Sequence, residues 1–349
     1  PGPAPGEIGA ALRRALRGAG TFLGCSGAWP GLGIMAREPF RMGRTDLLEL
    51  LVRYERAVED DAMNMLHPKP AERQMLGEDI LAKRAEKIRR ARDANRKYVE
   101  AVLTDLPDLC DGPGPAPARP IAEVIRPTQE TPSLAANSYG SMASVFLHLF
   151  RDWSSACEHV GRTTYQPAVD LLRAHLPQGG DVLVPGAGLG RLALEIASNP
   201  GFKVEANDAS RLFLTFADYI LNRAPEEPAT VFPLAHVFSE NWGHEQQYLE
   251  IKVPSPHPAA VLKGQPAISL APGDFAKMYG AGGVRHRRFD AIVTCFFIDT
   301  ATDVTELFGV MDGLLGPGGV WVNIGPLNWR KEARLKLNME EIIQVWERL

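Results

Sequence analysis

The chain has 349 residues, of which 45% are hydrophobic and 23% are charged, and its formal net charge is -4. This composition is ordinary for a globular protein with a full core. The slightly acidic balance argues against non-specific binding to nucleic acid or to an anionic membrane, because both favour a basic surface. No run of about 20 apolar residues is present, so the sequence predicts no membrane span.

The four cysteines are far apart and form no Cys-x-x-Cys or Cys/His cluster: they are Cys25, Cys110, Cys157 and Cys295. This pattern predicts a reducing compartment, without structural disulfides and without zinc or another bound metal. We therefore expect a cytoplasmic protein, with the nucleus as the alternative.

Residues 1–44 are rich in Gly, Ala, Pro and Arg, and Glu7 and Glu38 are their only acids. We interpret this segment as a low-complexity, disordered tail or a mistaken gene start, with an organelle transit peptide as the alternative. The first residue is Pro1, which indicates a fragment or a processed product.

Residues 45–130 are expected to form a helical region followed by a Pro/Gly-rich linker. Leu47, Leu51 and Tyr54 recur at helical spacing, and a second helical stretch runs to about residue 104. A basic cluster at residues 89–97 is interpreted as a solvated helix face, with contact to a phosphate backbone as the alternative. The helical region is also a candidate homodimer surface.

Residues 131–349 are predicted to form an α/β domain of the Rossmann-like type. Helices are expected at 141–154 and 165–176, and then strands at 181–185, 203–208, 289–297 and 320–325 with helices at 191–198, 210–222 and 304–315. This alternation predicts right-handed crossovers and a parallel sheet covered on both faces. Ligands of such sheets bind at the carboxyl ends of the strands.

A glycine-rich turn follows the first strand, with Gly186, Gly188 and Gly190 in the pattern G-x-G-x-G. The dinucleotide fingerprint needs a third glycine where this chain has Arg191, so a nicotinamide oxidoreductase is disfavoured. The turn fits S-adenosylmethionine-dependent methyltransferases better, and a tight turn without a ligand is the plain alternative.

Acidic residues follow two other strands, and a further one, Asp274, lies just upstream of the strand that begins at Phe289. Asp208 can accept hydrogen bonds from ribose hydroxyls, and either Asp208 or Ser210 can cap the next helix. Asp274 and Phe275 can contact an adenine ring or form an ordinary Gly-Asp turn. Asp299 ends a strand close to where a methyl donor would present its sulfonium, or it caps the following helix.

Several stretches together resemble the carnosine N-methyltransferase family over about residues 139–349. They are VPGAGLGRLA, ANDAS, GDF, CFFIDTA and LGPGGVWVNIGPL, with RDWS and YQP upstream. The resemblance implies S-adenosylmethionine as donor and a small dipeptide as partner, with no nucleic acid and no membrane. It further implies methylation of an imidazole nitrogen of histidine in carnosine or a related dipeptide, giving anserine from carnosine.

The resemblance also implies roles for individual residues. Arg151 matches an arginine that holds the donor, and we expect it to pair with the donor's carboxylate, while His148 stands where the family has a glutamine. Asp208 replaces a family glutamate, and Cys295 borders the donor. With the glycine turn, the expected donor site comprises His148, Arg151, Gly186, Gly188, Gly190, Asp208, Asp274, Phe275 and Cys295.

Asp299 matches the family aspartate that binds the substrate imidazole. By accepting one ring N–H, a carboxylate fixes the imidazole tautomer and stabilises the imidazolium that forms. Arg330 stands where the family has a substrate-binding histidine. Arginine cannot accept a hydrogen bond or act as a base, but it can bind the carboxylate of a dipeptide.

Two other functions stay open on the sequence alone. One is a protein or RNA methyltransferase that uses the helical region for docking, although an N/D-P-P-Y/F motif is absent. The other is a non-catalytic donor-binding partner protein. The last strands of a methyltransferase sheet are expected to lie beyond Leu349.

Overall fold

A computed structural model of the chain describes residues 42–104, 141–239, 241–262 and 268–349. The chain divides into two compact units. The sheet unit contains His159–Ala209 and Val261–Leu349, and the helical unit contains the described parts of Pro39–Glu158 and Ser210–Ala260. Neither unit is continuous in sequence, and the domain boundaries expected from the sequence stay predictions. Most of the expected tail and the expected Pro/Gly linker lie outside the described residues.

A five-stranded parallel sheet is the centre of the sheet unit, as predicted, with the order β5-β2-β1-β6-β7. Its strands are β1 (Gly180–Pro185), β2 (Phe202–Asp208), β5 (Ile268–Pro272), β6 (Phe289–Cys295) and β7 (Leu315–Ile324). The chain runs outward from β1 through β2 to β5 and then returns to β6. The strand order therefore reverses between β1 and β6, which is where ligands of such sheets bind.

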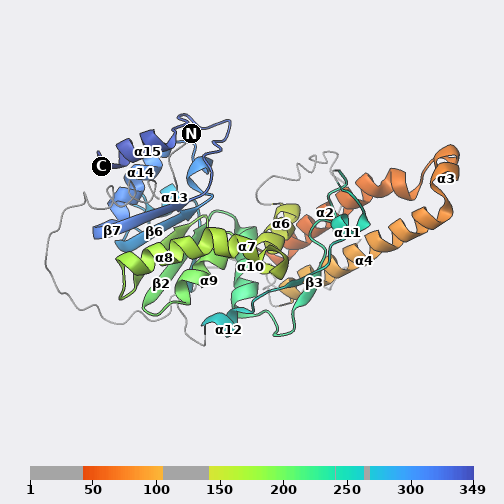
Figure 1. Cartoon of the computed structure of the whole chain (residues 1–349), viewed down its shortest axis with the longest axis horizontal. Coiled ribbons are helices and arrows are strands. Elements are labelled where there is room, and N and C mark those ends of the chain that lie inside the picture. Colours follow the sequence, from red (N-terminus) through yellow and green to blue (C-terminus); the bar gives the residue numbers. More distant parts are fainter. Residues whose placement is uncertain (1–41, 105–140, 240, 263–267) are drawn as a thin grey trace, which may run out of the picture. The chain divides into compact units, whose positions relative to one another are not determined.

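Helices cover both faces of the sheet (Figure 1). Val182 and Val184 of β1 face a core shared with α8 (Gln166–His175) and α9 (Arg191–Ala197). Leu183, between them, faces the opposite core, which is shared with α13 (Phe275–Tyr279), α14 (Val304–Leu314) and α15 (Met339–Trp346). Successive residues of a strand point to opposite faces, so a strand buried on both sides is apolar throughout.

The helix α15 was not predicted from the sequence. Its Trp346 ring lies 4.5 Å from Trp321 of β7 and 6.0 Å from Phe308 of α14. Asn338 and Glu341 form a capping box at its start. That pattern is a recognisable helix-start signal, and the tryptophan contacts fix the helix on the sheet.

The helical unit contains α2 (Arg44–Leu66), α3 (Pro70–Leu76), α4 (Glu78–Leu103), α6 (Met142–Trp153), η1 (Ser155–Cys157), α10 (Arg211–Asn222) and α11 (His244–Gln247). Its two short strands, β3 (Ala229–Val231) and β4 (Ile251–Val253), pair antiparallel. Within the described residues the chain passes between the units three times: in α7 (Glu158–Val160), which precedes η2 (Gly161–Tyr165), between Ala209 and Ser210, and in α12 (Pro258–Leu262). No helix in the described ranges is long and apolar enough to cross a membrane.

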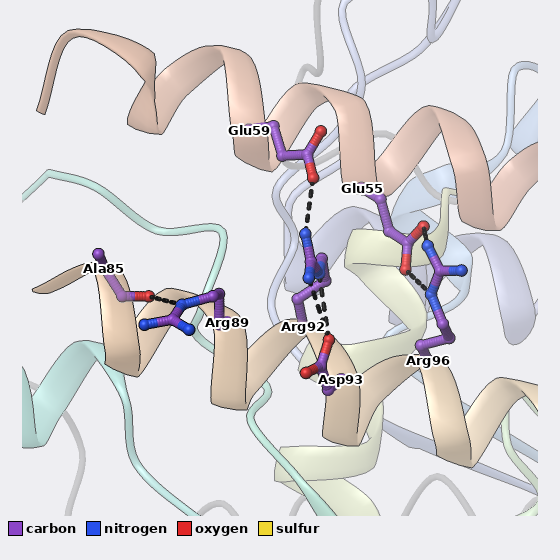
Figure 2. A network of polar contacts seen from close by, with 7 residues as sticks. All are labelled: Glu55, Glu59, Ala85, Arg89, Arg92, Asp93 and Arg96. Carbon is purple, nitrogen blue, oxygen red and sulfur yellow. Dashed lines mark hydrogen bonds and ion pairs between the residues drawn. The ribbon is translucent and has the colours of Figure 1, made fainter. Parts of the chain in front are cut away.

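Ion pairs join α2 and α4, as Figure 2 shows. The guanidinium of Arg96 binds both carboxylate oxygens of Glu55, with Nε donating to Oε1 at 2.8 Å. Arg92 Nη1 donates to Glu59 Oε1 at 2.9 Å. The basic cluster expected to be a solvated face is therefore largely neutralised by carboxylates of the same unit.

A buried asparagine holds the loop after β3 against α4. Asn95 Nδ2 donates to the carbonyl oxygen of Phe232 at 2.9 Å, and the N–H of Phe232 donates to Asn95 Oδ1 at 2.8 Å. Both polar atoms of the amide are thus paired, as buried amides require. This contact explains why residues 210–260 belong with the helices and not with the sheet.

Candidate active site

The turn after β1 needs its glycines. Gly186, Gly188 and Gly190 have φ values of 65°, 56° and 80°, which side chains other than glycine rarely adopt. A Cβ on Gly186 would lie only 2.6 Å from the Phe297 ring. The backbone therefore turns tightly at the carboxyl end of β1, where no side chain projects from the three glycines.

Asp208 ends β2, beside this turn. Its Oδ2 accepts a hydrogen bond from the N–H of Gly188 at 2.9 Å, and the side chain is buried. Of the two caps that the sequence offers for the following helix, the structure has Ser210, whose side chain accepts from the N–H of Phe213, and not Asp208. The carboxylate is thus anchored to the glycine turn, and its binding of a ribose stays a prediction.

Asn207 is a site residue that the sequence did not single out. Its Nδ2 donates to the carbonyl oxygens of Ala271 and Gly273, each at 2.9 Å. The N–H of Gly273 in turn donates to the carbonyl oxygen of Asp208 at 2.9 Å. These bonds join the ends of β2 and β5 and so position Asp274 at the same edge. A polar amide next to Asp208 at the end of the strand was the available signal.

Asp274 and Phe275 begin α13. The Oδ1 of Asp274 accepts from the N–H of Lys277 at 3.1 Å and caps the helix, while the side chain remains exposed. The ring of Phe275 is buried, with its centroid 5.3 Å from Tyr279 and 5.8 Å from Phe297. Asp274 thus faces solvent at the site, whereas little of the Phe275 ring remains for a ligand.

Phe296 is a second residue that the sequence did not single out. It follows Cys295 at the end of β6 and, with φ of 53°, is the one residue other than glycine with positive φ in the described chain. Its side chain is 40% exposed. The neighbouring Gly325 permits this conformation, since a Cβ there would lie 3.0 Å from the Phe296 nitrogen. Such strained residues cluster at ligand sites.

Cys295 itself is half-buried, as is Cys157 in the helical unit, and neither forms a disulfide with a described residue. The other two cysteines of the sequence lie outside the described residues. No cluster of three or more metal-ligating side chains occurs within those ranges.

Asp299 lies in η3 (Ile298–Thr300), just beyond β6, and is only 7% exposed. Its Oδ2 accepts from the N–H of Asn328 at 3.0 Å, and its carbonyl oxygen accepts from the N–H of Arg330 at 3.3 Å. The segment after β7 is thereby brought to the end of β6. No donor among the described residues binds Oδ1, so one carboxylate oxygen remains for a ligand.

The alternative that Asp299 caps α14 is wrong. Asp303 is the cap, and its Oδ1 accepts from the N–H groups of Thr305 and Glu306 at 3.0 and 3.1 Å. Asp303 also pairs with Arg334. The exposed Arg330, in contrast, forms no ion pair with the described residues, so it is available to an anionic group of a ligand.

His148 and Arg151 lie on α6 in the helical unit. Arg151 makes a two-pronged ion pair with the buried Asp152, with Nε–Oδ1 and Nη2–Oδ2 distances of 2.6 and 2.9 Å. His148 Nδ1 donates to the carbonyl oxygen of Ser144 at 2.7 Å. Burial and then the charge of Arg151 lower the pKa of His148, which favours a neutral ring. Their roles toward a donor stay predictions.

Comparison with known proteins adds the family. A sequence model described as carnosine N-methyltransferase matches residues 129–349. The carnosine N-methyltransferase of Schizosaccharomyces pombe is 35% identical over 199 residues, which are 55% of this chain and 53% of that protein. The Rattus norvegicus protein of the same name is 33% identical over 216 residues, which are 58% of this chain and 52% of that protein.

The chain thus spans about half the length of the curated relatives it matches. Among solved structures, Haemonchus contortus phosphoethanolamine N-methyltransferase 2 with bound S-adenosyl-L-methionine gives a TM-score of 0.37 at 16% identity. That alignment covers 62% of this chain and 43% of the other.

Proposed function

Because the chain belongs to the carnosine N-methyltransferase family, we propose that it methylates an imidazole nitrogen of histidine in carnosine or a related dipeptide, with S-adenosylmethionine as donor. Methylation of carnosine in this way gives anserine. The observation that carries the proposal is the carboxylate of Asp299, which is buried at the end of β6 with one oxygen bound to a backbone N–H. Its other oxygen is left to the acceptor.

The donor side fits a nucleoside. The glycine turn allows close approach to the backbone at the end of β1, and Asp208 is held beside it by Gly188. Asp274 is exposed and follows the end of β5. One of its carboxylate oxygens accepts the N–H of Lys277 in α13, and no described donor binds the other oxygen. This second oxygen can accept a hydrogen bond from an adenine amino group. When bound, the donor supplies an electrophilic methyl group on its sulfonium.

The acceptor side needs orientation more than base catalysis. Imidazole has a pKa near 6.5, so its neutral form is already a competent nucleophile at neutral pH. Asp299 Oδ1 accepts the N–H of one ring nitrogen, which leaves the lone pair of the other nitrogen aimed at the methyl group at roughly 3 Å. The same carboxylate stabilises the positive charge that grows on the ring during transfer.

Phe296 and Arg330 complete the acceptor side in this proposal. The exposed Phe296 ring offers an apolar face to the imidazole at the end of β6. Arg330, joined to Asp299 through the backbone, binds the carboxylate of the dipeptide.

The Arg330 role predicts a preference that can be measured. Wild-type protein should use carnosine with a kcat/KM about tenfold or more above that for its decarboxylated analogue, β-alanyl-histamine, because a charge-assisted bond is lost. Arg330→Gln should remove that preference, whereas the exposed Lys336→Gln should keep it. An unchanged preference in Arg330→Gln would exclude this role.

The activity is tested with the full-length protein and donor labelled on its methyl group. We expect label in carnosine, and calorimetric binding of S-adenosylmethionine but not of NAD. Label only in a histidine-containing protein or in RNA would point to a macromolecular substrate. Donor binding without transfer to any acceptor would point to a non-catalytic partner protein, and no heat with the donor would overturn the proposal.

A further inference from the structure

The segment between β7 and α15, residues 325–338, has no helix or strand of its own, yet it carries Arg330 of the proposed acceptor side. Two of its backbone groups bind Asp299. The N–H of Asn328 donates to Oδ2 at 3.0 Å, and the N–H of Arg330 donates to the carbonyl oxygen at 3.3 Å. Irregular segments are mobile unless contacts hold them, so the position of Arg330 depends on what else fastens this one.

Trp329, between these two residues, fastens the segment to the core of the sheet unit. Its indole Nε1 donates to the carbonyl oxygen of Leu337 at 2.8 Å. Its ring packs, as do Leu327 and Leu337, against the core that β6 shares with α14 and α15. Asn328 and Arg330 are exposed, whereas Trp329 is half-buried. The indole thus joins the part of the segment beside Asp299 both to the core and to the part that leads into α15.

The later part of the segment is held at the surface. The N–H of Arg334 donates to the carbonyl oxygen of Thr302 at 2.9 Å, and its guanidinium pairs with Asp303. The Arg334 side chain is 72% exposed, and exposed ion pairs contribute little to stability. Trp329 combines a partly buried hydrogen bond with the burial of a large ring, which makes it the stronger anchor.

We propose that Trp329 is a positioning residue for the methyl acceptor. By fastening residues 325–338 to the core, it keeps the exposed guanidinium of Arg330 within reach of an acceptor bound at Asp299. Asp299 itself lies in η3 beside Ile298, which is only 1% exposed, so loss of the Trp329 anchor displaces Arg330 more than the carboxylate. Trp329 therefore acts on acceptor affinity more than on the transfer step. This role rests on the function proposed above for Asp299 and Arg330.

The full-length protein offers a matched pair of variants. Trp329→Phe keeps an aromatic ring on the core and removes the indole donor. Trp321→Phe is the control, because the half-buried Trp321 of β7 also donates through Nε1 at 2.8 Å, to Thr294 Oγ1. Each variant loses one hydrogen bond of the same length in the same unit. Both should therefore melt slightly lower than wild type, by similar amounts.

The KM for the acceptor separates the two variants. Trp329→Phe should raise the KM for carnosine by about three- to tenfold, with kcat within about twofold of wild type, because the grip of Arg330 on the carboxylate weakens. The KM for β-alanyl-histamine, which has no carboxylate, should hardly change. Trp321→Phe should keep both wild-type KM values.

Three results would overturn this role while wild-type protein methylates carnosine. They are an unchanged KM for carnosine in Trp329→Phe, an equal rise in the two variants, and an equal rise for the two substrates. Wild-type protein that does not methylate carnosine would overturn the proposed function and, with it, this role.

A measurement on wild-type protein tests the same role without a variant. Coupling between two sites is reciprocal, so an acceptor held by Arg330 strengthens the Trp329 anchor in turn. With S-adenosylhomocysteine present, bound carnosine should slow hydrogen exchange of the Trp329 indole N–H by about threefold or more, and β-alanyl-histamine should slow it less. The Trp321 indole N–H is the internal control and should not respond. No slowing at Trp329 by bound carnosine, or equal slowing at both indoles, would overturn the role.

Discussion

Two buried acids of the sheet unit have nearly the same exposure but very different surroundings. Glu205 on β2 is 6% exposed, and Asp299 beyond β6 is 7% exposed. Glu205 accepts a hydrogen bond of 2.5 Å from the Tyr279 hydroxyl, and its Oε2 lies 3.3 Å from Arg285 Nη1 and 3.6 Å from Arg287 Nη2. Asp299 receives one backbone N–H.

The difference shows that burial alone does not distinguish a structural acid from a functional one. Every donor on Glu205 belongs to the protein, so its charge fastens α13 and the segment before β6 to the sheet. Asp299 keeps an oxygen that no described residue binds. Unused hydrogen-bonding capacity at the carboxyl edge of a sheet is therefore the better sign of a ligand-binding carboxylate.

The largest expected effect comes from Asp299→Asn. The amide oxygen can still accept from the N–H of Asn328, so the fold is kept, but the NH2 group cannot accept the imidazole N–H. Turnover of carnosine should fall by about 100-fold or more, as for other removed charge-stabilising groups. Donor affinity, measured by calorimetry, should stay within a few-fold. Unchanged turnover would show that Asp299 only braces the segment after β7.

Glu205→Gln is the matched change on β2, and it should do the opposite. It removes the charge that faces Arg285 and Arg287, so the free energy of unfolding should fall by about 1–3 kcal/mol. Well below the melting temperature, kcat should stay within a few-fold. Denaturant unfolding and turnover are measured on the same sample. A variant with wild-type stability and lost turnover would contradict the distinction between the two acids.

His236 extends the comparison to the helical unit. Its ring is buried 5.7 Å from that of Tyr54, neither nitrogen has a partner in the described structure, and burial lowers its pKa to about 4. At pH values between 6.5, the ordinary pKa of histidine, and about 4, His236 is more protonated in the unfolded chain than in the folded one. Stability should therefore fall as the pH drops through this window.

His236→Phe should remove this part of the pH dependence and keep the contact with Tyr54. Denaturant unfolding at pH 7, 5.5 and 4.5 measures how the free energy of unfolding of each protein depends on pH. The variant should lose less stability than wild type on acidification. Parallel pH profiles for the two proteins would show that His236 is not the group that titrates.

Asp303→Ala should have the smallest effect. A hydrogen bond from Thr305, together with the N–H of Glu306 and the charge of Arg334, lowers the pKa of Asp303 from its ordinary 3.8 to about 2. Its cap therefore stabilises α14 fully above pH 3.8 and loses that effect as the pH falls towards 2.

The variant should melt slightly lower than wild type at pH 7, with the difference shrinking near pH 2, and its turnover should be nearly unchanged. Thermal melts at both pH values and one activity assay measure this. A loss of turnover as large as that of Asp299→Asn would contradict the assignment of the cap to Asp303 and of the substrate to Asp299.

The parallel sheet could be predicted because β1 and β6 are largely apolar and β2 alternates apolar with polar residues, and helical patterns separate them. The positions of Gly186, Asp208 and Asp299 at the edge follow from that topology, since parallel strands end on one side. The strand β5 was missed because its sequence ISLAP is short and mixed, and only Ala271 in it is buried.

Other features depend on contacts between distant residues. The conformation of Phe296 relies on Gly325 of the neighbouring segment, and nothing in CFFID signals it. The helix cap is a different case: Asp303 and Glu306 have the spacing of a capping box, which favours Asp303 over Asp299. The grouping of residues 210–260 with α4 rests on Asn95, whose two hydrogen bonds span 137 positions of sequence.

A crystal structure of the full-length protein with S-adenosylhomocysteine and carnosine tests the central claim most directly. It should show the nucleoside over the carboxyl ends of β1 and β2, and an imidazole nitrogen within ~3 Å of Asp299 Oδ1. A structure in which a protein group occupies Oδ1 while carnosine binds elsewhere would contradict it.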